Sequence, residues 1–489
     1  MSGRPPHGPS AVAETHVSWV VLIGARAFKV LKPVDLGFLD HRSRGSRERA
    51  CRRELELNRR FAPDVYLGVL DVLGEDGRPR DHVIEMRRMP TARRLSALLG
   101  ADEARERVVE VAQAVAALHA ASPRSPEVDR SGEPERVVAN WEQGLAQVDA
   151  IAAGILPEGD RRRVERLALG YLAGRHDLLG RRIADGWVRD GHGDLLADDV
   201  FCLADGPRFL DCLAFDDRLR HADVLADAAF LAMDVEARGT EGLGQLLLET
   251  WARSLGETHP RSLADHYVAY RAHVRAKVAA LRHGQGDADA GAEARRLHDL
   301  CLQHLERARV RLVLVGGAPG TGKSTVAAAL GERTGWPVLR SDALRSRVTG
   351  PADAAGGAAR YGEGRYAPER RAAVYAELVQ EAADLLGVGT PVILDASWSS
   401  EAERGRALAA ARATRSDVVE IRCTAPADVA RRRIAERAAR GDDPSEATPE
   451  IARRLAADAD PWPASLPLDT DRPLAETVAR ALRLVDACG

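Results

Sequence analysis

Hydrophobic and polar positions alternate in short segments over the first ninety residues. Residues 15–23 (THVSWVVLI) and 25–33 (ARAFKVLKP) are rich in β-branched and aromatic side chains, and Gly24 separates them. This pattern predicts two strands joined by a turn. The start of the chain is rich in Pro, Gly and Ser, so we expect residues 1–14 to be disordered. Beyond the two strands the pattern predicts a helix and then two more strands, at 46–60, 65–73 and 81–88.

The middle of the chain is mainly helical in pattern. From about residue 101 to 185 apolar residues recur every three or four positions, as in ERVVEVAQAVAALH. Short strand-like pieces follow around GHGDLLADDV and PRFLDCL, and helices then continue to about residue 282. The segment 283–309 begins as a linker of small residues and ends as a helix. We therefore predict the following divisions: two lobes at 15–90 and 91–285, a linker helix at 286–308, and a second domain at 309–489.

The second domain has a different pattern, in which predicted strands and helices alternate. Four apolar strand patterns, each followed by a helical one, are VRLVLVGG, WPVLRSD, TPVILDA and SDVVEIRC. Such alternation predicts a parallel sheet in an α/β domain.

Bulk composition narrows the choice of function. The 489 residues carry a net charge of −3, which gives no general attraction to nucleic acid or to an anionic membrane. The apolar run at 17–25 is too short to span a bilayer and lacks a signal-peptide cleavage pattern. The six cysteines are scattered, without a CxxC pair or an interleaved histidine at zinc spacing. A cytoplasmic protein with reduced thiols fits best, and its oligomeric state stays open.

Lysine is rare in this chain. Of 70 basic residues only four are lysine, at positions 29, 32, 277 and 323. Arginine replaces lysine wherever charge alone is needed, so each remaining lysine is a candidate for a role that arginine cannot fill. Two of the four lie in phosphate-binding contexts.

The strongest motif is LVLVGGAPGTGKSTV at 312–326, which fits G-x-x-x-x-G-K-[ST] between a strand and a helix. Its glycines let backbone N–H groups turn toward phosphates, and the helix N-terminus adds positive potential. Lys323 can reach the β- and γ-phosphates of ATP, and the Ser324 hydroxyl can bind Mg²⁺. The predicted nucleotide-binding residues here are Gly317, Ala318, Pro319, Gly320, Thr321, Gly322, Lys323, Ser324 and Thr325.

Acidic and basic residues follow the other strands of this domain. Asp395 closes the strand PVILD and is a candidate second Mg²⁺-binding carboxylate, although strand-end aspartates also serve as simple caps. Asp342 and Arg345, at i and i+3, would share one face of a helical turn. An aspartate there can accept a hydroxyl proton while an arginine holds an anionic group. A plain helix cap with a solvated arginine is the alternative.

These motifs resemble those of a P-loop kinase family of the AAA_33 type, which includes gluconate-kinase-like and polynucleotide 5′-kinase-like enzymes. The resemblance covers about 310–465 and implies that Asp342 is the base on the substrate side and that Arg345 orients substrate or phosphate. It also implies that TAPADVARRRIAERAARGDDPSEAT is a lid. There Arg433 and Arg437 lie four apart on one helical face, where they would close over the transferred phosphoryl group, unless the helix is simply solvated.

The first 285 residues carry Lys29 in a strand, Glu54 in CRRELELNRR, HVIEMRRMP, the triplet HGD at 192–194, and FLDCLAF, in that order. This order resembles aminoglycoside phosphotransferases and choline kinases, and FDDRLRHADVLADAAFLAMDVEARG is similar to proteins that fuse such a domain to a P-loop domain. The resemblance implies an α+β, protein-kinase-like fold. It implies these roles: a phosphate-binding Lys29 with Glu54 as its ion-pair partner, an adenine-binding hinge near Glu85 to Arg87, a base at Asp194, and a metal ligand at Asp211.

Two positions depart from that family's pattern. Asp199 stands where the family has a metal-binding asparagine, and Ala214 stands where the fused proteins usually have an acid. A carboxylate binds hard cations at least as readily as an amide, so Asp199 remains a candidate metal ligand. Three aspartates at 194, 199 and 211 would crowd negative charge, and we expect at least one raised carboxyl pKa.

The sequence therefore predicts an ATP- and Mg²⁺-dependent kinase with two nucleotide-binding domains that phosphorylates a hydroxyl of a small molecule. In this prediction the P-loop domain is active, and the first domain is a second kinase, an attenuated kinase or a nucleotide-responsive partner. A polynucleotide 5′-hydroxyl kinase is an alternative, but from residue 309 onward 26 Lys and Arg balance 25 Asp and Glu, with only six aromatics. A nucleotide-sensing regulatory ATPase is the other alternative.

Overall fold

The computed structural model describes the backbone at residues 11–15, 17–35, 39–152, 154–240, 242–349, 368–440, 453–454 and 457–487. The side chains at 346, 348, 349, 368 and 437–440 lie outside this description. The chain forms two compact units. One comprises residues 1–164, 179–259 and 264–304, and the other comprises 165–178, 260–263 and 305–489.

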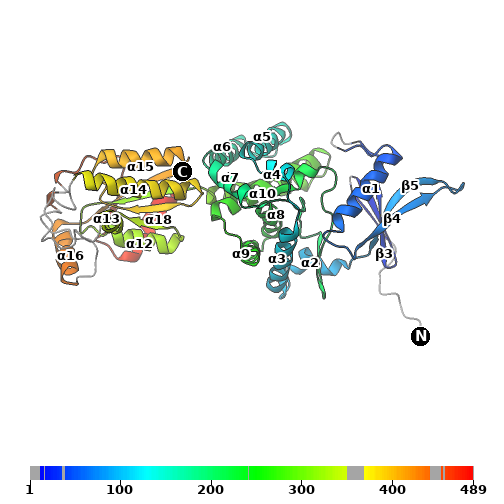
Figure 1. Ribbon diagram of the computed structural model, residues 1–489, viewed down its shortest axis with the longest axis horizontal. Helices are drawn as coiled ribbons and strands as arrows, with labels where there is room; N and C mark the ends of the chain where they lie inside the picture. Colours follow the sequence, from blue (N-terminus) through cyan, green and yellow to red (C-terminus); the bar gives the residue numbers. More distant parts are fainter. Residues whose placement is uncertain are drawn as a thin grey trace. The chain divides into compact units, whose positions relative to one another are not determined.

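The first unit begins with a five-stranded antiparallel sheet in the order β1-β2-β3-β5-β4. Its strands are β1 Ala11–Glu14, β2 Ser18–Ile23, β3 Arg26–Leu31, β4 Tyr66–Leu73 and β5 Pro79–Arg87. Helix α1 Arg44–Asn58 starts at Ser43, whose side chain accepts a hydrogen bond from the Ser46 N–H, and it packs against β4 and β5 (Figure 1). Cys51, Ile84 and Tyr66 are buried in the core between helix and sheet.

The sequence pattern predicted β2, β3, α1, β4 and β5 correctly to within a few residues. It was wrong for residues 11–14, which we expected to be disordered but which form the edge strand β1, paired with β2 from Ala11↔Leu22 to Glu14↔Trp19. All four β1 residues are exposed, so the strand is held by the backbone ladder and not by burial, and a hydrophobic pattern cannot reveal it.

The rest of the region up to residue 307 is mainly helical. Its helices are η1 Thr91–Arg93, α2 Leu95–Leu98, α3 Ala104–Ala121, α4 Pro126–Arg130, α5 Pro134–Ile151, α6 Glu158–Ala173, α7 His176–Ala184, η2 Asp217–Leu219, α8 Val224–Ala237, α9 Leu243–Leu255, α10 Arg261–Gly284 and α11 Ala290–Arg307. Two small antiparallel pairs join β6 Val188–Asp190 to β9 His221–Asp223 and β7 Val200–Leu203 to β8 Gly206–Phe209. Helix α8 is buried over most of its length and contacts α3 and α9.

The second unit contains a five-stranded parallel sheet in the order β11-β12-β10-β13-β14. Its elements are β10 Arg311–Gly316, α12 Lys323–Thr334, β11 Val338–Arg340, α13 Ser341–Thr349, α14 Pro368–Gly387, β12 Val392–Asp395, α15 Glu401–Ala413, β13 Asp417–Thr424, α16 Ala427–Arg440, β14 Leu466–Asp469 and α18 Leu474–Ala487. Helices α14 and α15 cover one face of the sheet, and α12 and α18 cover the other (Figure 1).

The predicted parallel α/β sheet is confirmed, with the four expected strands in place. The fifth strand, β14, was missed because LPLD is short and contains Pro467. It pairs with β13 alone and so lies at the edge of the sheet, where proline is tolerated. Among the described helices of the chain, none is both long enough and apolar enough to cross a membrane.

Candidate functional site

The loop between β10 and α12 carries three glycines with left-handed backbone angles. The angle φ is +138° at Gly317, +83° at Gly320 and +79° at Gly322. A Cβ atom at Gly317 would lie 2.6 Å from the Cys423 carbonyl oxygen, and one at Gly320 would lie 2.5 Å from that of Ala430. Both positions therefore need glycine for the backbone angle and for space. This is the tight backbone path that a phosphate-binding loop requires.

One hydrogen bond within the loop and one from the residue that follows β14 stabilise the conformation of the loop. Thr321 Oγ1 donates to the Ala318 carbonyl at 2.7 Å, and Thr470 Oγ1 donates to the Thr321 carbonyl at 2.7 Å. Lys323 and Ser324 begin α12 and are half-buried, and neither side chain has a hydrogen-bond partner within the described part of the chain. A helix N-terminus with an unengaged lysine and hydroxyl is suited to bind phosphate. The remaining residues of the predicted motif, Pro319 and Thr325, lie in the same segment.

Asp395 ends β12 beside the phosphate-binding loop. Its register partners are Val315 in β10 and Arg340 in β11. The residue is 3 % exposed, and its Oδ2 lies 3.3 Å from Arg340 Nε. Its Oδ1 is buried and has no hydrogen-bond partner among the residues that the structure describes. A buried carboxylate oxygen without a partner is costly, so the residue is well suited to a ligand such as a hydrated cation.

Asp342 and Arg345 lie where the i, i+3 spacing predicts. Both are in the first turns of α13, with side chains 15 % and 18 % exposed, and Arg345 Nη1 lies 3.3 Å from Asp342 Oδ1. The structure therefore places the two side chains together on one helical face. Their roles as base and substrate-orienting residue remain predictions.

Arg433 reaches the phosphate-binding loop from α16. Its Nη2 donates to the Thr470 carbonyl at 2.9 Å and its Nη1 lies 3.3 Å from Thr470 Oγ1, the hydroxyl that also holds Thr321. A Cβ atom at Gly322 would lie 3.6 Å from Arg433 Nη1. Arg433 therefore lies close to the loop, and its role as a lid residue remains a prediction. Arg437 is in α16, but its side chain lies outside the described part of the chain.

The first unit assembles a second charged cluster from three distant segments. Lys29 Nζ in β3 lies 2.7 Å from Glu54 Oε1 in α1 and 2.7 Å from Asp211 Oδ1. Burial disfavours the charged form of Lys29, but the charges of Asp211 and Glu54 outweigh it and raise its pKa. The Lys29 charge in turn lowers the pKa of Asp211. The ion pair expected between Lys29 and Glu54 is therefore formed, and its role in phosphate binding remains a prediction.

Asp211 adopts a backbone angle that is unusual outside glycine, with φ of +66°. Three hydrogen bonds fix this segment: Tyr66 Oη accepts from the Asp211 N–H at 3.1 Å, and fully buried Asn58 accepts from the Cys212 N–H at 2.8 Å while donating to the Glu54 carbonyl at 3.0 Å. Asn58 therefore ties the helix that carries Glu54 to the segment that carries Asp211. Left-handed angles held in this way are typical of functional sites.

The loop that contains HGD is held by a buried carboxylate on α8. Asp227 accepts from the N–H groups of His192 at 2.7 Å and Gly193 at 2.9 Å, and its Oδ2 lies 3.2 Å from His119 Nε2. Trp251 Nε1 donates to His119 Nδ1 at 2.9 Å, which leaves the His119 proton on Nε2 to face Asp227. Burial opposes ionisation of Asp227, but the hydrogen bond and charge of His119, together with the charges of His192 and Arg271, outweigh it and lower the pKa of Asp227.

The three aspartates of this site differ in their surroundings. Burial raises the pKa of Asp194 to about 6, a suitable value for a base near neutral pH. Burial, followed by the charges of Asp211 and Asp194, raises the pKa of Asp199 well above its usual value. The expected rise is therefore present, with burial as its largest cause and charge crowding second. The neighbouring Asp198 is not one of these three aspartates, and its Oδ1 accepts a hydrogen bond from the Ser96 hydroxyl at 2.5 Å.

The predicted hinge lies at the end of β5. Arg26 Nε is 3.1 Å from Glu85 Oε1, and Arg87 Nη1 is 3.1 Å from Asp64 Oδ2. The backbone N–H of Arg87 donates to the Val65 carbonyl at 2.8 Å. An adenine contact at Arg87 would therefore use its carbonyl and not its N–H. Binding of adenine by this segment remains a prediction.

The whole chain has close relatives. Over 474 residues it is 41% identical to "Uncharacterized protein Rv2004c" of Mycobacterium tuberculosis (strain H37Rv) and to "Uncharacterized protein Mb2027c" of Mycobacterium bovis, which covers 97% of this chain and 95% of each relative. The chain belongs to this protein family. Residues 312–461 also match the family model AAA_33, described as an AAA domain.

Solved structures similar to this family member fall into two groups. A sugar kinase from Janibacter sp. HTCC2649 is 18% identical, covers 36% of this chain and 95% of its own, and has a TM-score of 0.29. A choline/ethanolamine kinase family protein from Mesorhizobium loti is 13% identical, covers 61% and 92%, and has a TM-score of 0.37. A choline kinase from Cryptosporidium parvum Iowa II is 11% identical, covers 61% and 89%, and has a TM-score of 0.41.

Several site residues of this family member were missed from the sequence. Asn58, Tyr66, Asp227 and Arg340 hold the site residues in place, yet each lies in an ordinary helix or strand pattern. The sequence offers a signal only for Asp227, an acid at a position that is otherwise apolar in the very hydrophobic run VLADAAFLAM. Because burying a charge is costly without partners, such an acid predicts a buried hydrogen-bond acceptor.

Proposed function

We propose that the protein is an ATP-dependent phosphotransferase with two nucleotide-binding domains, acting on hydroxyl groups of small molecules. The observation that carries the proposal is the P-loop site. Its glycines adopt the strained path of a phosphate-binding loop, and its lysine is unengaged. A buried carboxylate oxygen of Asp395 without a partner lies at the end of the neighbouring strand. Use of ATP would place the activity in the cytoplasm.

In the P-loop domain the residues would act by positioning and by charge. Lys323 would bind the β- and γ-phosphates, Asp342 would accept the proton of the acceptor hydroxyl, and Arg345 would orient the acceptor. Arg433, beside the loop, would neutralise charge on the phosphoryl group. Ser324 and Asp395 fit Mg²⁺, because this cation prefers oxygen ligands and uses one or two carboxylates together with substrate phosphates. Mg²⁺, when bound, would supply positive charge against the phosphate oxygens.

In the first domain the cluster of Lys29, Glu54 and Asp211 supports a second nucleotide site. Lys29 would bind phosphate, and Asp194, with its raised pKa, would accept the hydroxyl proton. Asp199 and Asp211 supply carboxylate oxygens suited to Mg²⁺. Among the described residues no group of three or more His, Cys, Asp or Glu is close enough to form a metal site by itself, so phosphate oxygens would have to complete it.

The P-loop role is tested with the Asp342→Asn variant. Phosphoryl transfer from labelled ATP to a panel of hydroxyl compounds would be measured in a Lys29→Met background, which removes the first site. We expect transfer to fall about 10²-fold or more, because the proton acceptor is lost. The matched control is Glu476→Gln, which removes an exposed acid from the first turn of α18. Unchanged transfer in Asp342→Asn would exclude Asp342 as the base. ATP hydrolysis indifferent to every added compound would instead favour a nucleotide sensor.

A further inference from the structure

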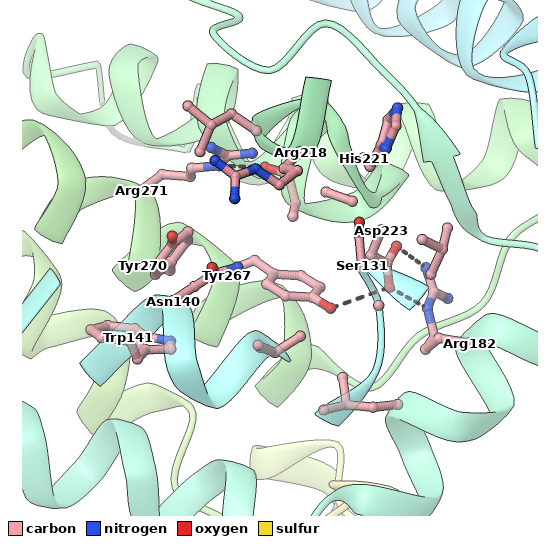
Figure 2. Close-up of a pocket in the computed structure, with 17 residues that line it drawn as sticks. Ser131, Asn140, Trp141, Arg182, Arg218, His221, Asp223, Tyr267, Tyr270 and Arg271 are labelled. Atoms are coloured by element: carbon pink, nitrogen blue, oxygen red, sulfur yellow. Dashed lines mark hydrogen bonds and ion pairs between the residues drawn. The ribbon is translucent and has the colours of Figure 1, made fainter. Parts of the chain in front are cut away.

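A cavity of about 70 Å³ lies in the helical part of the first unit. Residues from the end of α4, from α5 and α7, from the η2–β9 segment and from α10 line it. Trp141, Tyr267 and Tyr270 form aromatic walls (Figure 2). A water molecule needs about 10–15 Å³ of such space, and pockets for drug-sized ligands have about 300–1,000 Å³, so the cavity suits a ligand of only a few heavy atoms.

The carboxylate of the cavity wall is already occupied. Asp223 accepts two hydrogen bonds from Arg182, both at 2.7 Å, one from the Tyr267 hydroxyl at 3.3 Å and one from the Leu225 N–H at 2.9 Å (Figure 2). Arg182 also pairs with buried Glu257, so its charge is balanced by two acids. Asp223 is the only acid among the residues that line the cavity. A cationic acceptor, such as an aminoglycoside or choline, would find no free carboxylate on these walls.

Arg271 is a buried cation of the cavity wall that is not paired with an acid among the described residues; its guanidinium lies over the Phe230 ring, 4.6 Å from the ring centroid. The residue is only 7 % exposed, its Nε donates to the Ala226 carbonyl at 3.1 Å, and its Nη1 lies 3.5 Å from the Gly193 carbonyl. Its Nη2 has no hydrogen-bond partner, and no carboxylate lies within ion-pair distance of it, among the described residues. Buried charges are normally paired, so a buried arginine without an acid is suited to an anionic ligand.

Arg271 also connects the cavity to the catalytic loop. Gly193, whose carbonyl it approaches, directly precedes Asp194. Burial raises the pKa of Asp194, and the positive charges of Arg275 and Arg271 oppose that rise. A small anion bound by Arg271 would therefore lie next to the backbone of the loop that carries Asp194.

We propose that this cavity binds the anionic group, carboxylate or phosphate, of a small hydroxyl-bearing acceptor, with Arg271 as its counter-charge. The inference rests on the proposed phosphotransferase function of the first domain. The acceptor hydroxyl oxygen bonds to the γ-phosphorus of ATP, the bond from that phosphorus to the β–γ bridging oxygen breaks, and ADP leaves. The hydroxyl proton passes to Asp194.

Binding is tested by calorimetry on the full-length Lys323→Ala protein with a non-hydrolysable ATP analogue and Mg²⁺. The probes are D-glycerate, glycerol 3-phosphate and choline, so that the carboxylate and phosphate sources are measured separately. We expect at least one anion to bind and choline not to bind. Arg271→Gln should weaken anion binding about tenfold or more, since hydrogen bonds to charged groups contribute about 1.5–3 kcal/mol and 1.4 kcal/mol is tenfold. Arg253→Gln, an exposed arginine on α9, is the matched control and should change nothing.

A second variant keeps the test valid if Arg271→Gln does not fold. Asn140 lines the cavity and is exposed, so Asn140→Asp adds a negative charge there without disturbing a buried contact. It should also weaken anion binding. Tighter binding of choline than of either anion, no anion binding by the parent protein, or full anion binding in both cavity variants would overturn the proposal. The same protein would then be incubated with the bound anion and ATP in place of the analogue, and ADP would be measured. Anion binding without ADP formation there would leave the anion site standing and would count against transfer by this domain.

Discussion

The two sites handle charge in opposite ways. In the first domain Lys29 lies between two carboxylates, those of Glu54 and Asp211, each 2.7 Å from its Nζ. In the P-loop domain Lys323 has no partner within the described chain, and the loop is shaped by backbone angles at three glycines. The first site is therefore built from side chains that form ion pairs with one another. The second is built from a backbone conformation that exposes N–H groups and an unpaired lysine for phosphate.

This contrast follows from where the residues lie in the sequence. The P-loop site is mostly local, because Gly317 to Ser324 span eight consecutive positions. The first site joins Lys29 to Glu54, 25 residues away, and to Asp211, 182 residues away. It depends on the whole unit being folded, and its supports, such as Asn58 and Asp227, are as important as the site residues. Changes far from the first site should therefore affect it more than they affect the P-loop.

The largest effect is expected from substituting the lysine of each site, Lys29 or Lys323, separately. Lys323→Met should reduce nucleotide binding and phosphoryl transfer at the P-loop about 10²-fold or more, because the positive charge that binds the transferred phosphate is lost. Lys29→Met should do the same to the first site only. Transfer and nucleotide affinity would be measured in each single variant and in the double variant. If either single variant silences both sites, the two are not independent.

Asp227→Ala tests the dependence of the first site on a distant support. The change leaves two buried N–H groups, of His192 and Gly193, without their acceptor, at about 1–3 kcal/mol each. We expect the first unit to unfold at a lower urea concentration and to lose nucleotide binding, while the P-loop keeps its affinity. Asp205→Ala, which removes an exposed aspartate, is the control. An equal loss of nucleotide affinity at both sites would show that the P-loop site depends on Asp227 as much as the first site does.

Asp199→Asn sharpens the account of the first site. Replacing this buried carboxylate by an amide removes one charged oxygen ligand, so the Mg²⁺ concentration needed for half-maximal nucleotide binding should rise about tenfold. The measurement uses a Lys323→Ala background, in which only the first site remains. Higher transfer in this variant would mean that Asp199 attenuates the site, and lost transfer would mean that it is a working ligand. No change in Mg²⁺ or nucleotide binding would show that the loop does not bind the metal.

The smallest effect concerns pH and a third charged cluster. His304 on α11 has Nδ1 2.7 Å from Asp265 and Nε2 2.8 Å from Glu236. Burial opposes its charged form, but the hydrogen bonds to Asp265 and Glu236 outweigh it and raise the pKa of His304. A raised histidine pKa adds stability that is complete below about pH 6.5 and is lost as pH rises through the folded-state pKa.

His304→Gln should therefore lower the free energy of unfolding at pH 6 by about 1–3 kcal/mol. The difference from the parent protein should shrink toward pH 9, because there the parent has already lost the charged pair. Urea midpoints at both pH values measure it, with His283→Gln, an exposed histidine, as the control. A difference that grows with pH would contradict the direction of the pKa shift.

Much of the fold could be predicted from the sequence, and the reasons for the failures are physical. Strands β10 and β12 are buried over their whole length and mainly apolar, and β13 alternates buried apolar residues with more exposed polar ones, so their patterns are strong. The edge strands β1 and β14 carry little apolar signal, because neither is buried on both faces. The resemblance to aminoglycoside phosphotransferases and choline kinases implied the pairing of Lys29 with Glu54, but a sequence pattern cannot show that Asn58 or Asp227 holds the loops. Those contacts depend on tertiary packing alone.

The number of nucleotides bound per chain tests most directly whether the protein has two separate nucleotide sites. A non-hydrolysable ATP analogue with Mg²⁺ would be titrated into the full-length protein by calorimetry. The account predicts two nucleotides for the parent protein, one for Lys29→Met, one for Lys323→Met and none for the double variant. A parent protein that binds one nucleotide, lost on changing either lysine alone, would contradict the existence of two separate sites.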